Sequence, residues 1–73
     1  MTELAQRKIN EVVLTKNLVK LTEKFGWITA HSMMVNRYSI PYANLLWDKA
    51  MMKGYVYRAR DGRILLTEKG YEL

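Results

Sequence analysis

The sequence predicts an α+β fold that is mainly helical, with an extended first helix, two further helices and a two-stranded β-hairpin. Three observations predict it. Glycine occurs only at positions 26, 54, 62 and 70, and these glycines divide the chain into segments. Residues 3–25 contain neither glycine nor proline and are rich in Leu, Lys and Glu, which favour helix. Residues 55–67 hold two runs of aromatic, β-branched and apolar residues around Asp61-Gly62, a strong two-residue hairpin signal.

The composition is that of one small domain, spanning residues 1–73, with a thin core. No apolar run approaches the ~20 residues that cross a bilayer, and the N-terminus lacks the pattern of a signal peptide. The chain has no cysteine, so neither disulfides nor thiolate metal sites are expected. We therefore expect a cytoplasmic protein. The net charge of +5 and pI of about 9.7 are typical of nucleic-acid-binding domains.

A long first helix is expected over residues 3–25, with Thr2 as its N-cap and Gly26 as its stop. It carries two apolar stripes, one formed by Leu14, Leu18, Leu21 and Phe25 and the other by Ala5, Ile9, Val12 and Val13. At about 100° per residue the stripes point to roughly opposite sides. Either the helix breaks near residues 15–17, or a straight helix serves two partners. In the second case residues 1–13 form an extension, and the second stripe is a candidate homodimer interface.

The middle of the chain is expected to hold a short strand and two helices. Residues 27–28, Trp-Ile, could form a strand stub, after which Thr29 is a candidate N-cap for a helix over residues 30–37. Ser39 is well suited to cap a third helix that runs from Ile40 to about Lys53. Spacing of i, i+3, i+4 and i+7 predicts one buried stripe on this third helix, made of Ala43, Leu46, Trp47 and Ala50.

The hairpin is expected to form strands over residues 55–60 and 63–67, joined by Asp61-Gly62 with φ above zero at both turn positions. Arginines crowd its tip: Arg58, Arg60 and Arg63. Three cations around one turn repel each other and gain from an anionic partner. The tip is therefore a candidate phosphate contact.

Residues 46–56 and 66–70 carry a resemblance to a known family. The first segment, LWDKAMMKGYV, places a glycine between an apolar helix end and an apolar pair, and the second reads LTEKG. The expected order is helix, short strand, helix, turn, helix and hairpin. In these respects residues 12–70 resemble the winged helix-turn-helix DNA-binding family, with no subfamily identified.

The resemblance implies a small protein that binds double-stranded DNA and regulates transcription. Its third helix would enter the major groove, and its wing, residues 55–67, would touch the backbone or the minor groove. The candidate DNA contacts are Arg37, Ser39, Tyr42, Asn44, Lys49 and the wing arginines Arg58, Arg60 and Arg63. Asn44 can bond to adenine through two hydrogen bonds, and Tyr42 can contact a phosphate or a thymine methyl. Leu45, Asp48 and Met52 suit such a face less well.

A second class of function stays open. Winged helices also bind proteins or structured RNA, as adaptors or ribosomal components, and exposed Leu45 and Met52 would favour a protein contact. An enzyme is not expected, because the chain has no Gly-rich phosphate loop and no metal-ligand cluster, and His31 stands alone. We expect no cofactor, no small-molecule ligand and no membrane partner.

Overall fold

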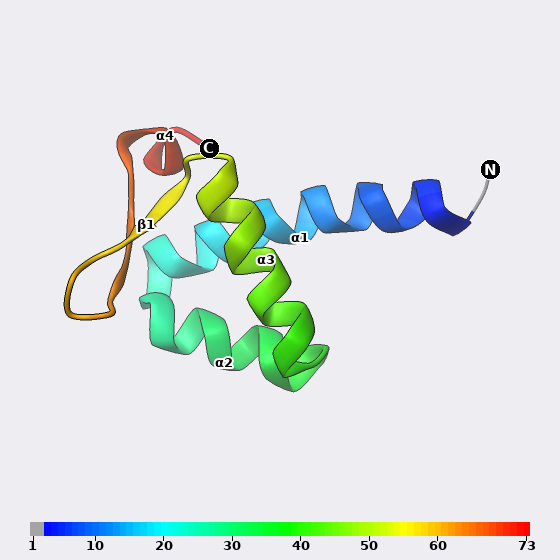
Figure 1. The fold of residues 1–73 in the computed structure, drawn as a ribbon, viewed down its shortest axis with the longest axis horizontal. Helices are drawn as coiled ribbons and strands as arrows, with labels where there is room; N and C mark the ends of the chain where they lie inside the picture. The colour runs from blue at the N-terminus through cyan, green and yellow to red at the C-terminus, as the bar shows by residue number, and fades with distance from the viewer. Residues whose placement is uncertain (1–2) are drawn as a thin grey trace.

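The computed structural model describes the backbone of residues 3–73 and the side chains of residues 10–73. Thr2 and the side chains of Ala5 and Ile9 lie outside this part. The elements in chain order are α1 (Glu3–Phe25), α2 (Trp27–Arg37), α3 (Ile40–Met52), β1 (Val56–Arg58), β2 (Ile64–Leu66) and α4 (Glu68–Tyr71) (Figure 1). The predicted fold class, α+β and mainly helical, is therefore confirmed.

The first helix is continuous, so the alternative prediction of a break near residues 15–17 is wrong. It ends as predicted at Gly26, which adopts a left-handed φ of 91°. The Gly26 N–H donates a hydrogen bond of 2.9 Å to the Thr22 carbonyl, which closes the last turn. In Figure 1, α3 stands across α1, and the hairpin lies at the C-terminal end of α1.

The second helix begins at Trp27, directly after Gly26, so two predictions are wrong: the strand stub at residues 27–28 and Thr29 as the N-cap. The Gly26 carbonyl accepts a hydrogen bond of 3.1 Å from the Ala30 N–H, so the first turn of α2 forms at once. Trp27 and Ala30 are one helical turn apart, and both pack into the core from this turn. A helix here places both apolar side chains on the same buried face, whereas a strand would point them to opposite faces.

The turn between α2 and α3 consists of Tyr38 and Ser39, as predicted. The Tyr38 N–H donates to the Met34 carbonyl at 2.9 Å and finishes α2. The Ser39 hydroxyl oxygen accepts from the Tyr42 N–H at 3.1 Å, and Pro41 lies in the first turn of α3, where no donor is needed. The predicted cap of the third helix is confirmed.

The core is formed by one side of each long helix and by the inner face of the hairpin. Its buried apolar side chains are Leu18, Val19, Ala30, Met34, Ala43, Leu46, Trp47, Ala50, Val56 and Ile64. The predicted stripe on α3 is confirmed, because all four of its members are in this set. The predicted α1 stripe is confirmed in part: Leu18 is buried and Leu14 and Leu21 are half-buried. Phe25 is half exposed, since the buried face of α1 is rotated toward Val19 and Thr22.

The hairpin is antiparallel, with Val56 opposite Leu66 and Arg58 opposite Ile64, but both strands are shorter than predicted. The predicted two-residue turn at Asp61-Gly62 is wrong. The Gly62 N–H donates to the Ala59 carbonyl at 3.0 Å, and within residues 59–63 only Gly62 has a positive φ, of 92°. Residues 60 and 61 therefore occupy the centre of the turn, and Gly62 is the left-handed residue that follows it.

A short helix, α4, covers the junction between α3 and β1, a helix that the local sequence pattern did not predict. The Thr67 oxygen accepts from the Gly70 N–H at 3.1 Å, and the same hydroxyl donates to the Gly54 carbonyl. Gly70 is buried so close to Tyr55 that an added Cβ would stand 2.1 Å from the Tyr55 carbonyl oxygen. The last turn of the chain can thus pack here only with glycine at this position.

Candidate nucleic-acid interface

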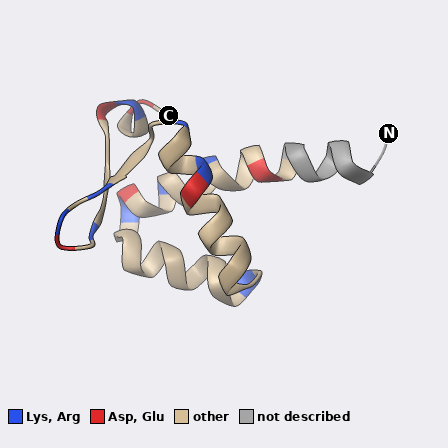
Figure 2. Cartoon of the chain, viewed as in Figure 1, with Lys and Arg blue, Asp and Glu red and all other residues tan. Residues whose placement is uncertain are grey.

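The hairpin loop is the most concentrated basic feature of the described chain. Figure 2 shows it as a loop of mainly blue residues with one red segment. Arg58, Arg60 and Arg63 are all exposed there, and Asp61 is the acidic residue. Three arginines against one aspartate leave a local charge of +2.

The Asp61 side chain forms its hydrogen bonds within the hairpin loop itself. Its carboxylate accepts from the Arg63 backbone N–H at 3.1 Å and from the Arg63 Nε at 2.7 Å. The hydrogen bond from the Arg63 backbone is the main cause that lowers the pKa of Asp61, and the Arg63 side chain adds to it. Within the described chain no carboxylate lies within 4 Å of Arg58 or Arg60. These two guanidinium groups are therefore the ones available to an anion.

The outward face of α3 is mixed in chemistry. Its exposed side chains include Asn44, Leu45 and Asp48, together with Met52, which is 82% exposed. Asn44 is exposed as predicted and can offer both a donor and an acceptor to a base edge. Because its neighbours are apolar or acidic, this face is less suited to binding a polyanion than the hairpin loop is.

Two of the predicted contacts on α3 are not fully exposed. Lys49 is half-buried, and its Nζ lies 3.9 Å from the Glu11 carboxylate on α1. Tyr42 is also half-buried, with its ring centroid 5.3 Å from that of Tyr38. Desolvation raises the pKa of Tyr42, and the charges of Glu11 and Tyr38 add to the effect. Tyr42 and Lys49 are therefore only partly exposed, because α1 and the α2–α3 turn pack beside them.

Arg37 and Ser39 lie at the corner between α2 and α3. Both are exposed, but the Ser39 oxygen already caps α3. In Figure 1 this corner lies apart from the hairpin, at the other end of α2. The predicted site residues thus divide into the hairpin loop on one side and the α2–α3 corner with Asn44 on the other.

The described residues hold no group of three or more His, Cys, Asp or Glu side chains that could bind a metal ion. His31 instead accepts a hydrogen bond from the indole of Trp47. No helix among the described residues is both long enough and apolar enough to span a bilayer.

Sequence reasoning missed the pairing of Asp61 with Arg63, although a signal was present. An aspartate two residues before a backbone N–H is the pattern of an Asx-turn, in which the side chain takes the place of a backbone acceptor. The link between His31 and Trp47 had no comparable signal, because it joins two helices across sixteen positions.

Comparison of the chain with protein-family models, with curated proteins and with solved structures gave no match. Any function must therefore be inferred from the geometry and charge of this chain.

Proposed function

We propose that this chain is a cytoplasmic winged helix-turn-helix protein that binds double-stranded DNA and regulates transcription. In this proposal α2 and α3 form the helix-turn-helix, the hairpin is the wing, and α3 enters the major groove. The capped turn at Ser39 and the close packing of α3 on α1 and α2 support this reading. The described chain has no strand between α1 and α2, which is a departure from the usual element order of that family.

The observation that carries the proposal is the pair of exposed arginines on the wing, Arg58 and Arg60. A guanidinium can bind two phosphate oxygens at once, and the paired Asp61 and Arg63 hold the loop in one shape. Contacts of this kind fix a protein on the duplex without reading its sequence. Base reading in the proposal falls to Asn44 on α3.

The test is a titration of labelled duplex DNA with the unmodified chain and with Arg58→Ala plus Arg60→Ala, at several salt concentrations. The double variant should bind all duplexes more weakly, with a logarithmic salt slope that falls by roughly 0.9 for each phosphate that the variant no longer neutralises. Both side chains are exposed, so the fold should be unchanged.

Lys16→Ala with Lys53→Ala is the matched control, because it removes the same charge from exposed positions outside the wing. If the control lowers the slope as much as the wing variant, the effect is one of net charge, and the wing has no special role. Single-stranded DNA and duplex RNA should bind more weakly than duplex DNA. Tighter binding of duplex RNA than of duplex DNA would replace DNA with RNA as the target.

A second candidate function is a protein-binding module of the same fold, and the outward face of α3 favours it. Leu45 and Met52 are exposed there and would gain from an apolar partner. Salt separates the two functions, since phosphate binding weakens steeply with salt and apolar contact does not. Duplex binding that is undetectable at low salt would favour this second function.

We also propose that the chain acts as a homodimer through α1. Val12 and Val13 are 50% and 49% exposed, which supports a second apolar side on this helix. A dimer would present two copies of α3 to a pseudo-palindromic site.

A further inference from the structure

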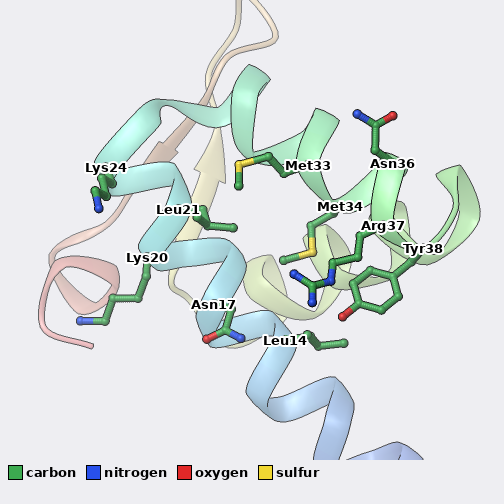
Figure 3. A pocket seen from close by; sticks show the side chains of 10 residues that line it. All are labelled: Leu14, Asn17, Lys20, Leu21, Lys24, Met33, Met34, Asn36, Arg37 and Tyr38. Atoms are coloured by element: carbon green, nitrogen blue, oxygen red, sulfur yellow. The ribbon is translucent and has the colours of Figure 1, made fainter.

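A groove lies between α1 and α2, with a volume of about 790 Å³. Figure 3 shows Leu14 and Leu21 on one helix and Met33 and Met34 on the other around the same space. Met34 is buried, whereas Met33 is 43% exposed. The groove therefore has an apolar floor that stays open to water.

The charged side chains along the groove all have the same sign. Lys20 and Lys24 follow the α1 edge, and Arg37 lies at the end of α2 (Figure 3). The Lys20 ammonium group donates to the backbone carbonyl of Leu73, so this side chain points away from the methionines (Figure 3). Lys24 and Arg37 are therefore the cations left for a bound helix. None of the ten lining residues is acidic. An apolar strip with cations beside it is complementary to a surface that is apolar in the middle and acidic at its sides.

The groove also has the length of a short helix. Its α1 side runs from Leu14 to Lys24, ten residues at 1.5 Å each, or about 15 Å. That distance is close to three helical turns, which is the span of apolar anchors at i, i+4, i+7 and i+11. The two methionines in the groove have flexible side chains that can adapt to such anchors.

We propose that this groove binds an acidic amphipathic helix of a partner protein. The apolar side chains of that helix pack on Leu21 and Met33, and its flanking carboxylates lie near Lys24 and Arg37. A nucleic-acid backbone is a poorer occupant, because its phosphates would use the cations and leave the apolar floor uncovered. The groove shares Arg37 with the candidate DNA contacts but includes neither the wing nor the outward face of α3. The Met33 variant below therefore tests binding of this helix separately from DNA binding.

The test uses the full chain and a synthetic labelled helical peptide of about 16 residues. The peptide carries Leu and Phe at i, i+4, i+7 and i+11, with Glu on both sides of that stripe. Two further peptides serve as comparisons: one has every Glu replaced by Lys, and the other is a scrambled sequence of the same composition. Fluorescence anisotropy should show saturable binding of the acidic peptide, with both comparisons weaker by about tenfold or more.

The apolar floor is tested with Met33→Glu, which should weaken the acidic peptide by about tenfold, since it places a charge against the buried stripe. Met52→Glu is the matched control, because Met52 is more exposed and lies on α3 outside the groove. It should leave peptide affinity unchanged. Equal weakening in both variants would overturn the proposal.

Reversal of the charge provides a test that does not depend on the floor. Lys24→Glu with Arg37→Glu changes exposed side chains and should make the chain prefer the Lys peptide over the acidic one. Lys16→Glu with Lys53→Glu alters the net charge equally, outside the groove, and should keep the original preference.

Three outcomes would overturn the proposal. The first is acidic peptide that binds no better than its scrambled form, and the second is a control that reverses the preference as fully as the groove variant. The third is a groove variant that loses duplex DNA as strongly as the wing variant while no peptide binds. That result would assign the groove cations to nucleic acid.

Discussion

The indole Nε1 of Trp47 donates a hydrogen bond of 2.9 Å to Nδ1 of His31, which links α3 to α2. The two rings lie 24° from parallel, with centroids 6.4 Å apart. Trp47 is only 3% exposed, so its N–H depends on this acceptor. The bond therefore joins the two helices that the proposed function places on DNA.

Loss of the acceptor should destabilise the fold. His31→Ala leaves the buried Trp47 N–H without a partner, and we expect the free energy of unfolding to fall by about 1–3 kcal/mol. Urea denaturation followed by circular dichroism measures it. In a double-mutant cycle, Trp47→Phe removes the donor, so His31→Ala should cost less in that background. Equal costs in both backgrounds would show that the hydrogen bond contributes nothing.

Gly70→Ala should be among the most damaging small substitutions in the chain. The added Cβ would lie 2.1 Å from the Tyr55 carbonyl oxygen, which accepts a hydrogen bond of 2.9 Å from Thr67. Overpacking of this kind costs about 1–3 kcal/mol, and rigid backbone on both sides favours the upper end. Thermal unfolding measures the loss. Glu72→Ala, at an exposed position beside α4, is the control, and an equally small effect of both changes would contradict the close approach.

The parts of the fold that the sequence predicted are those set by local patterns. Ser39 capped α3 because its hydroxyl needs only the N–H three positions on. The α3 stripe was predictable because helical spacing decides which side is buried. The second helix begins three residues before its predicted start, because Gly26 allows α2 to begin directly after α1. Nothing in the sequence at Trp27 distinguishes a strand from a helix.

The candidate site was less predictable, because it depends on neighbours from other elements. Asn44 is exposed on α3 as its phase predicts, but Lys49 is half-buried with its Nζ 3.9 Å from the Glu11 carboxylate on α1. Tyr42 is covered from the side of Tyr38. The helical phase of the sequence predicts which side of α3 faces the core. It does not predict that another helix, α1, packs beside residues next to that buried side.

The pKa of Asp61 should report directly on the hairpin turn. Because hydrogen bonds lower this pKa in the folded chain, the charged carboxylate stabilises the turn above the unfolded pKa. That contribution is lost as pH falls through the folded pKa. In Arg63→Ala the midpoint of the Asp61 carboxyl titration, followed by NMR, should rise but stay below the unfolded value, since the backbone N–H remains. Arg60→Ala should leave the midpoint in place, and an Arg63 variant that titrates unchanged would contradict the pairing.

Asn44 and Asp48 should have opposite effects on duplex binding. If Asn44 reads a base, Asn44→Ala should cost about 1–3 kcal/mol at one position of the site and relax the preference there. Asp48→Ala removes a negative charge from the same exposed face and should strengthen binding to all duplexes at low salt. Competition binding with single-base variants of a selected site measures both. Equal weakening on every sequence for Asn44→Ala would make that side chain a backbone contact.

The dimer proposal can be tested on α1 alone. Val12→Glu with Val13→Glu places two charges on side chains that are half exposed in the single chain, so the fold should persist. The variant should sediment as a monomer, whereas the unmodified chain at micromolar concentration should sediment as a dimer. Ile28→Glu with Tyr71→Glu adds the same number of carboxylates at exposed positions elsewhere and should remain dimeric.

Dissociation of the dimer should also weaken duplex binding, because one chain would then hold a single half-site. The dimer is expected to set its two copies of α3 near ~34 Å apart, the spacing of adjacent major grooves on one side of DNA. Insertion of five base pairs between half-sites rotates them by about half a turn, so it should weaken the unmodified chain and leave the Val12 and Val13 variant unaffected. An unmodified chain that sediments as a monomer would rule out this interface, and the exposed valines would then need another partner.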